Sequence, residues 1–295
     1  MQSLLDGLNR EQQQAVQHTE GPLLILAGAG SGKTKVLTVR IAYLLAQGVN
    51  PYEILAITFT NKAAREMSQR IARLVGEGDT SDFVSTIHGF CVKVLRRDVY
   101  RLGFPRTFPI LDQEDGKVLA AEVMQELKLS RRDLTVRKFL DGIGLKKRME
   151  GVRYVEDYMD SGAKVEATND RFTLYLQKQL KSFALDYDDL IYFTLHLFES
   201  YPEVREFWQN ELQFVMVDEA QDCNSADWRI INHITAKSGN LFVVGDPDQA
   251  IYEWRGAEPR LFIEFSPSKD VILNENYRST KAILRVANAI VRNNV

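Results

Sequence analysis

Several features that assign proteins to special classes are scarce or missing in this sequence of 295 residues. Two cysteines, Cys91 and Cys223, are too few for a disulfide framework or a zinc pattern, which favours a reducing, cytosolic compartment. No apolar run is long enough to span a bilayer. The first residues lack the basic start and apolar core of a secretory signal. We therefore expect a cytoplasmic protein with no membrane partner.

An excess of basic residues is also missing. The chain has 37 Lys and Arg against 40 Asp and Glu, which gives a net charge of −3. Composition alone thus gives no sign of a nucleic-acid partner, so any such partner must bind a local groove. The hydrophobic content of 45% is that of an ordinary globular protein. The length suits one large domain or a domain with an insertion.

The most informative stretch that is present covers residues 23–45. An apolar run with the length of a strand leads into a small, flexible loop, and apolar residues recur at helical spacing after Lys33. In this order, loop N–H groups and the helix dipole can cradle a polyphosphate, Lys33 adds a charge, and Thr34 offers a hydroxyl to magnesium. The pattern G-x-x-x-x-G-K-[ST] is met except at Ala27, and a chance glycine turn is the alternative. The loop reads Gly28-Ala29-Gly30-Ser31-Gly32.

Short apolar strands alternate with helical patterns, which predicts a parallel α/β sheet. Ligands of such sheets gather at the carboxyl ends of the strands. Between about residues 112 and 201 the strand signals vanish, and charged helical segments predict an α-helical insertion. We expect strands over residues 23–27, 53–58, 83–85, 214–217, 241–244 and 271–273, and a closing helix over residues 281–291.

Polar residues follow the last three of these strands. Asp218 and Glu219 come directly after the fourth strand, and buried acids at such a place need a cation. After a phosphate loop the natural cation is magnesium, with the first acid holding the metal and the second polarising the attacking water. An acidic helix cap is the alternative. Gln249 suits contact with the terminal phosphate or its attacking water, and Arg278 could act as an arginine finger.

Aromatic residues near the strand ends have two interpretations. Phe59 follows the second strand and is either a stacking platform or a core anchor. Tyr252 and Trp254, beside Arg255, either form a platform for unpaired bases or pack in the core. His88 is either a catalytic base or a polar residue of a linker.

Two further segments also leave alternatives open. Gln12 carries an amide that can match the N6 and N7 edge of adenine, whereas a solvated helix face is the simpler interpretation. Asn9 is well placed to cap this helix. The middle of the helical insertion forms either a phosphate-contact surface or a solvated helical face. Its basic residues are Arg131, Arg132, Arg137, Lys138, Lys146, Lys147, Arg148 and Arg153.

As an ordered set, these motifs resemble the amino-terminal half of superfamily 1 DNA helicases of the UvrD/Rep/PcrA type. They read LNREQ, AGAGSGKT, AITFTNKAAREM, STIHGFC, LDYDDL, VDEAQD, VVGDPDQAIYEWRGA and NENYRST. The resemblance covers nearly the whole chain, and only the helical insertion is weakly marked. One departure is Ala220, where many relatives carry an aromatic residue.

The resemblance implies a fold and a domain order. The fold class is α/β: a RecA-like P-loop NTPase domain with a parallel sheet, plus an α-helical insertion subdomain. The RecA-like domain is expected over residues 1–111 and 201–280, the insertion over 112–200, and the start of a second RecA-like domain over 281–295. The family's remaining motifs have no counterpart after Val295. We therefore expect part of a longer helicase, with weak nucleotide binding and little DNA-stimulated hydrolysis on its own.

The resemblance also implies ATP and Mg²⁺ as cofactors and assigns roles to residues of this sequence. The implied catalytic residues are Lys33, Glu219, Gln249 and Arg278. The implied metal ligands are Thr34 and Asp218. The implied nucleotide-binding residues are Gln12, Ala27, Gly28, Ala29, Gly30, Ser31, Gly32, Lys33, Thr34, Tyr277 and Arg278. The implied contacts to single-stranded DNA are Phe59, Asn61, His88, Tyr187, Tyr252, Trp254 and Arg255.

The implied activity is 3′→5′ movement along DNA, driven by ATP hydrolysis, in DNA repair or replication restart. The implied partners are single-stranded DNA, junctions of single- and double-stranded DNA, and repair or replication proteins. One rival is a P-loop kinase without a nucleic-acid partner, which would leave Phe59, Tyr252 and Trp254 without a role. The other rivals are a nucleotide-binding scaffold and a subunit of a recombination helicase–nuclease, which the compact insertion disfavours.

Overall fold

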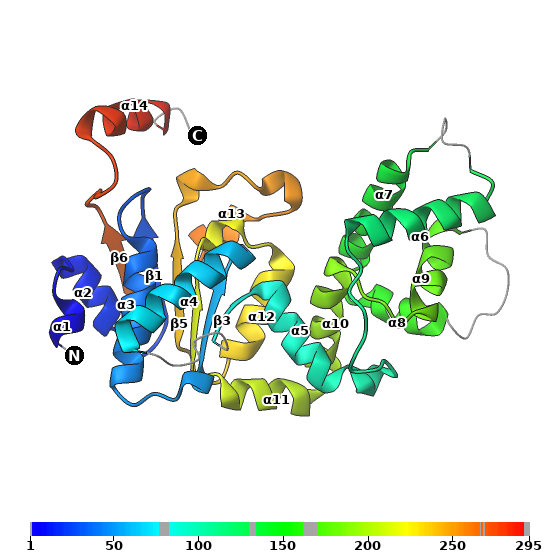
Figure 1. Cartoon of the computed structure of the whole chain (residues 1–295), viewed down its shortest axis with the longest axis horizontal. Coiled ribbons are helices and arrows are strands. Elements are labelled where there is room, and N and C mark those ends of the chain that lie inside the picture. Colours follow the sequence, from blue (N-terminus) through cyan, green and yellow to red (C-terminus); the bar gives the residue numbers. More distant parts are fainter. Residues whose placement is uncertain are drawn as a thin grey trace. The chain divides into compact units, whose positions relative to one another are not determined.

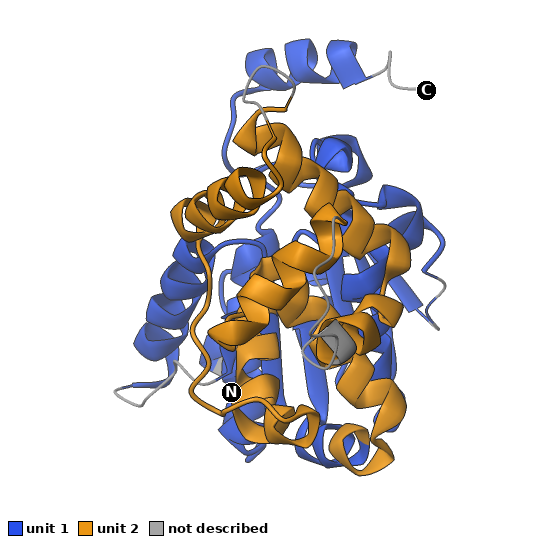
Figure 2. Cartoon of the chain, turned by 90° about the vertical axis from the view of Figure 1, so that its right-hand side faces the viewer, with its two compact units in different colours: residues 1–87, 206–295 blue, residues 88–205 orange. Residues whose placement is uncertain are grey.

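A computed structural model of the chain describes residues 2–76, 83–129, 134–161, 170–265, 267 and 269–291. They form two compact units, the first built from residues 1–87 and 206–295 and the second from residues 88–205 (Figure 2). The boundaries fall within α5 (Ile87–Asp98) and within α11 (Pro202–Glu211). The domain limits expected at residues 112, 200 and 280 stay predictions. Arg131, Arg132 and residues 292–295 lie outside the described residues.

The first unit is built around a six-stranded sheet in which every pair of neighbours is parallel, with the order β3-β2-β4-β5-β1-β6 (Figure 1). Each strand lies where the sequence predicts it, so the α/β class with a parallel sheet is confirmed. The strands are β1 (Leu23–Ala27), β2 (Ile54–Thr58), β3 (Val84–Thr86), β4 (Phe214–Val217), β5 (Leu241–Gly245) and β6 (Lys269–Leu273).

The central strands are apolar on both sides because both faces of the sheet are covered. One face packs in a buried cluster with α3 (Lys33–Ala46) and α4 (Asn61–Val75), and it includes Ile25, Ala56 and Met216. Alternate residues of the same strands point to the other face, and they are buried too: Leu24, Leu55, Val215 and Val243. Helix α12 (Ser225–Thr235) packs against β4.

Two short helices, α1 (Gln2–Leu5) and α2 (Arg10–Gln17), precede the sheet. Asn9 caps α2 by accepting the backbone N–H of Gln12 at 2.8 Å, which confirms the predicted cap. The other end of α2 is held by Arg40, whose guanidinium is buried and donates to the carbonyls of Ala15 and Val16. Burial lowers the pKa of Arg40 to about 9. Helix α2 is therefore capped at its first turn and held against α3 at its last.

The sheet unit ends with α13 (Pro259–Ile263) and α14 (Lys281–Val291), and the bounds of α14 are those that the sequence predicts. The second unit is helical: after α5 come α6 (Gln113–Glu126), α7 (Val136–Glu150), α8 (Arg153–Ser161), α9 (Arg171–Lys181) and α10 (Tyr187–Ser200). Its core is rich in buried aromatic residues, namely Phe104, Tyr154, Tyr158, Tyr175 and Phe193. Within the described ranges, no helix combines the length and apolar character needed to cross a membrane.

A buried ion network joins α7 to α10 in this second unit. Lys147 is fully buried, and its Nζ lies 2.7 Å from Oδ2 of Asp186 and 2.6 Å from Oδ1 of Asp189. Tyr154 donates its hydroxyl to Oδ1 of Asp189 at 2.8 Å. Burial, followed by the charge of Asp186, raises the pKa of Asp189 to about 7. Both interpretations of Lys147 were therefore wrong, because it neither faces solvent nor is free to contact a phosphate.

Candidate nucleotide and nucleic-acid site

The glycine-rich loop connects β1 to α3 in a tight turn, and two of its glycines have left-handed backbone angles. Gly30 and Gly32 have φ angles of 74° and 90°, which residues with a Cβ rarely adopt. Ser31 donates its hydroxyl to the carbonyl of Gly28 at 2.7 Å and closes the turn. A Cβ on Gly32 would lie 2.8 Å from Nε2 of Gln12, so the loop packs closely against α2. Ala27 is buried at the end of β1, where a small residue fits.

The candidate lysine and base contact each other. Lys33 is 8% exposed, and its Nζ lies 3.0 Å from Oε2 of Glu219. Glu219 has a φ of 51°, a strained conformation for a residue other than glycine. Burial, followed by the charge of Glu219, raises the pKa of Asp218 to about 7, whereas the charge of Lys33 opposes this shift. The end of β4 thus presents two acids to the lysine of the phosphate loop.

A chain of hydrogen bonds runs from Glu219 to the end of β5. Gln221 donates Nε2 to Oε2 of Glu219 at 3.0 Å, and its Oε1 accepts the backbone N–H of Asp246 at 3.1 Å. Gln249 in turn donates Nε2 to Oδ2 of Asp246. A Cβ on Gly245 would lie 2.6 Å from Oε1 of Gln221, so glycine is needed at this position. The structure therefore connects the predicted base to the predicted phosphate sensor.

The predicted metal ligands, Thr34 and Asp218, follow β1 and β4. Among the residues that the structure describes, no group of three or more His, Cys, Asp or Glu side chains could hold a metal ion by itself. Mg²⁺ is usually bound by one or two protein oxygens together with substrate phosphates and water. The buried carboxylate of Asp218 and the hydroxyl of Thr34, in the first turn of α3, are groups of the kind that such a shared site uses, and their role stays a prediction.

The predicted adenine contacts are brought together by Asn9, which the sequence predicted only as a helix cap. Gln12 is 1% exposed; its Oε1 accepts the N–H of Asn9 at 3.1 Å, and its Nε2 donates to the carbonyl of Ser31 at 3.0 Å. Asn9 also donates Nδ2 to the hydroxyl of Tyr277 at 3.0 Å. Beyond these two hydrogen bonds, the amide of Gln12 has the capacity to donate one more and to accept one more. The ring of Tyr277 is 61% exposed and thus accessible for stacking.

The turn after β6 lies directly on the phosphate loop. The backbone N–H of Tyr277 donates to the carbonyl of Gly30 at 2.9 Å. The Cβ of Arg278 lies 2.7 Å from the position that a Cβ on Gly30 would occupy. Arg278 itself is exposed, so its guanidinium has room to reach a phosphate bound at the loop.

Three aromatic rings form a row in the first unit. The ring centroids of Phe59 and Tyr252 are 4.8 Å apart, and those of Tyr252 and Trp254 are 6.5 Å apart. The guanidinium of Arg255 lies 5.7 Å from the Tyr252 centroid and 5.6 Å from that of Trp254. Trp254 is 80% exposed and Phe59 is 39% exposed, so neither is a core residue. Asn61 is the first residue of α4 and is exposed. It follows Phe59 closely in the sequence.

The other two predicted DNA contacts belong to the second unit. His88 and Tyr187 lie edge to face, with ring centroids 5.4 Å apart and an angle of 82° between the ring planes. Tyr187 is 53% exposed at the start of α10. The structure therefore brings these two residues together as a pair within the second unit.

The family model of the UvrD/REP helicase N-terminal domain matches residues 8–270 of this chain. The chain belongs to this family. It is 46% identical to the ATP-dependent DNA helicase PcrA of Bacillus subtilis (strain 168), over 99% of the chain and 40% of the relative. It is 44% identical to PcrA of Staphylococcus aureus (strain NCTC 8325 / PS 47), over 100% of the chain and 41% of the relative. The chain thus spans about two fifths of the length of these curated relatives, and the resemblance drawn from the motifs is confirmed.

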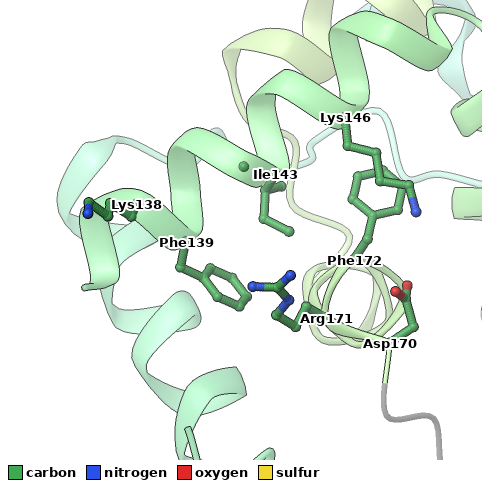
Figure 3. Close-up of a pocket in the computed structure, with 8 residues that line it drawn as sticks. Lys138, Phe139, Ile143, Lys146, Asp170, Arg171 and Phe172 are labelled. Carbon is green, nitrogen blue, oxygen red and sulfur yellow. The ribbon is translucent and has the colours of Figure 1, made fainter. Parts of the chain in front are cut away.

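This UvrD/REP-family chain also has a basic pocket in its second unit, between α7 and α9 (Figure 3). The pocket has a volume of about 150 Å³. Lys146 lies over the ring of Phe172, with Nζ 4.2 Å from the centroid. Asp170 is engaged as the cap of α9, where it accepts the N–H of Thr173 at 2.8 Å. The lining residues are Lys138, Phe139, Gly142, Ile143, Lys146, Asp170, Arg171 and Phe172.

Sequence reasoning assigned no role in the candidate nucleotide site to several polar residues. Each one lies inside a motif that was singled out, but its role depends on a partner from a distant part of the chain. The signal available in the sequence was therefore the position of each missed residue close to Gln12, Glu219, Gln249 or Tyr277 within one motif. The missed residues are Asn9, Gln221, Asp246, Glu275 and Asn276.

Proposed function

We propose that this chain carries the ATP-binding part and a single-strand-binding part of a DNA helicase that translocates 3′→5′ with ATP and Mg²⁺. One observation carries the proposal. Within a single unit, the network from Lys33 through Glu219 to Gln249 follows β1, β4 and β5, while the aromatic row follows β2 and β5. Both therefore lie at the carboxyl ends of strands in one parallel sheet, where ligands of such sheets bind.

In this proposal the residues of the network divide the hydrolysis between them. The loop N–H groups and Lys33 would hold the β- and γ-phosphates, and Thr34 and Asp218 would hold Mg²⁺, which would offset the phosphate charge. Glu219 accepts the proton of the water that attacks the γ-phosphorus, as the bond to the ADP oxygen breaks. Gln249 orients this water, and Arg278 stabilises the charge of the transition state. Because Glu219 pairs with Lys33, a phosphate that binds Lys33 would compete with the base for this lysine.

In this proposal, the loop after β5 both senses the γ-phosphate and contacts DNA. Gln249 lies three residues before Tyr252 and five before Trp254, so a change at the γ-phosphate can move the aromatic row. Bases would stack on the rings beside Arg255, as on other single-strand platforms. In the second unit, we propose that Lys138, Lys146 and Arg171 contact DNA phosphates.

Binding measurements on the chain test this function. A fluorescent ATP analogue with Mg²⁺ should bind the wild type, and Lys33→Ala should abolish most of that binding. Substitution of Trp208 and Trp228 isolates the fluorescence of Trp254, which oligo-dT should then quench. Nucleotide binding without any response to oligo-dT would contradict the DNA role and favour a P-loop kinase.

A nucleotide-binding scaffold is the second candidate. In the intact protein, Glu219→Gln should retain nucleotide binding but abolish hydrolysis and strand separation, whereas a scaffold would keep its activity. For the helicase, we propose repair or replication restart as the process, with junction DNA and proteins of these processes as partners. A subunit of a recombination helicase–nuclease is the alternative within the family.

A further inference from the structure

The side chain of Asn276 joins two parts of the candidate nucleotide site. Its Nδ2 donates to the carbonyl of Ala29 in the phosphate loop. Its Oδ1 accepts the backbone N–H groups of Arg278 at 3.0 Å and Ser279 at 2.8 Å. One short amide therefore closes the turn that carries Arg278 and ties that turn to the loop.

The turn packs so closely on the loop that Gly30 has no space for a Cβ. At Gly30, an added Cβ would lie 2.8 Å from Nδ2 of Asn276 and 2.7 Å from Cβ of Arg278. Gly30 also accepts the N–H of Tyr277, so a hydrogen bond from the backbone lies beside that from the Asn276 side chain. The backbone of residues 276–279 is thus held in one register against the phosphate loop.

We propose that Asn276 is a positioning residue that sets the place of Arg278 relative to a bound γ-phosphate. Only an amide of this length supplies a donor for the loop carbonyl together with an acceptor for two N–H groups. Aspartate would retain the acceptor but direct a negative charge at the carbonyl of Ala29. The inference rests on the proposed function, because it requires Arg278 to sense the third phosphate.

A double-mutant cycle on the whole chain tests this role. The readout is the ratio of the dissociation constants for a fluorescent ADP and a fluorescent, non-hydrolysable ATP analogue, both with Mg²⁺. Arg278→Ala should remove the preference for the triphosphate. Asn276→Ala should lower that preference about three- to tenfold in the wild type, the range expected within one hydrogen-bond network. In the Arg278→Ala background it should change nothing further, since Asn276 acts through Arg278.

Two further variants keep the test decisive. Asn274→Ala removes an exposed asparagine from the same segment and should leave the ratio unchanged. Asn276→Asp retains the turn, as judged by thermal melting, and should still lower the ratio. An equal effect of Asn276→Ala in both backgrounds, or none in the wild type, would overturn the inference alone. A wild type that binds neither nucleotide would overturn the proposed function as well.

Discussion

Trp254 is the residue whose environment most directly indicates a ligand. Its ring is 80% exposed beside Tyr252 and Arg255, although burial of an indole is strongly favourable. We expect Trp254→Ala to weaken binding of oligo-dT by about 1–3 kcal/mol, the usual loss for a base-stacking ring. Fluorescence anisotropy of a labelled oligonucleotide measures this change, and the melting temperature should stay the same because the ring supports no core.

A matched control is Tyr52→Ala. Tyr52 is 67% exposed in the same unit, but it precedes β2, whereas Phe59 follows it, so the two lie at opposite edges of the sheet. This control should leave DNA affinity unchanged. Equal losses from the two variants would show that exposed rings bind the oligonucleotide without a defined site.

At the scale of elements, the ion network between α7 and α10 makes a strong prediction. Lys147→Met would leave Asp186 and Asp189 without their buried cation, and removal of one partner from such a network costs about 3–5 kcal/mol. Chemical denaturation followed by circular dichroism measures the loss. Arg137→Met is the control, because its 4.0 Å ion pair with Asp141 in the same helix is exposed on both sides and worth under about 1 kcal/mol. Similar stabilities for the two variants would refute the structural role of Lys147.

The carboxyl group of Asp227, at the start of α12, is expected to make the stability of the fold depend on pH. Asp227 is 7% exposed; one carboxylate oxygen accepts the N–H of Asn224 at 3.1 Å, and the other is buried without a hydrogen-bond partner among the described residues. Burial raises the pKa of Asp227 from 3.8 to about 6. The protonated form is therefore favoured by folding, and this contribution, complete below pH 3.8, is lost as the pH rises through about 6.

Asp227→Asn should remove this dependence while retaining the cap. Relative to the wild type, the variant should gain little stability near pH 4 and about 2–3 kcal/mol above pH 7. Melting curves of both proteins across this range provide the measurement. A constant difference between them would contradict the raised pKa.

At the scale of the whole molecule, net charge limits how DNA can bind. The chain carries −3 overall, and the aromatic row has Arg255 as its neighbouring cation. We therefore expect stacking to provide most of the affinity for a single strand, with about two to four phosphate contacts. The slope of log K against log salt should be about −1.5 to −3, from titrations between low and moderate salt. A slope steeper than about −5 would instead indicate an extended phosphate-binding surface.

The sequence by itself determined the order of the elements. Each predicted strand and the closing helix 281–291 were found, because apolar runs bounded by glycine and polar residues act locally. The cap of α2 by Asn9 was likewise predictable, since it involves only residues 9–12. Helices α11, α12 and α13 were not predicted, because their patterns are short or mixed.

Only the tertiary structure decided which polar residues meet. Lys147 was one cation among eight in the sequence, yet packing placed it between two acids that lie 39 and 42 residues further along the chain. Asn276 contacts Ala29 across 247 residues, and Lys33 meets Glu219 across 186. A local pattern predicts a strand or a loop because its cause lies within a few residues. Contacts of this range depend on how helices and strands pack in the folded chain, which no local pattern contains.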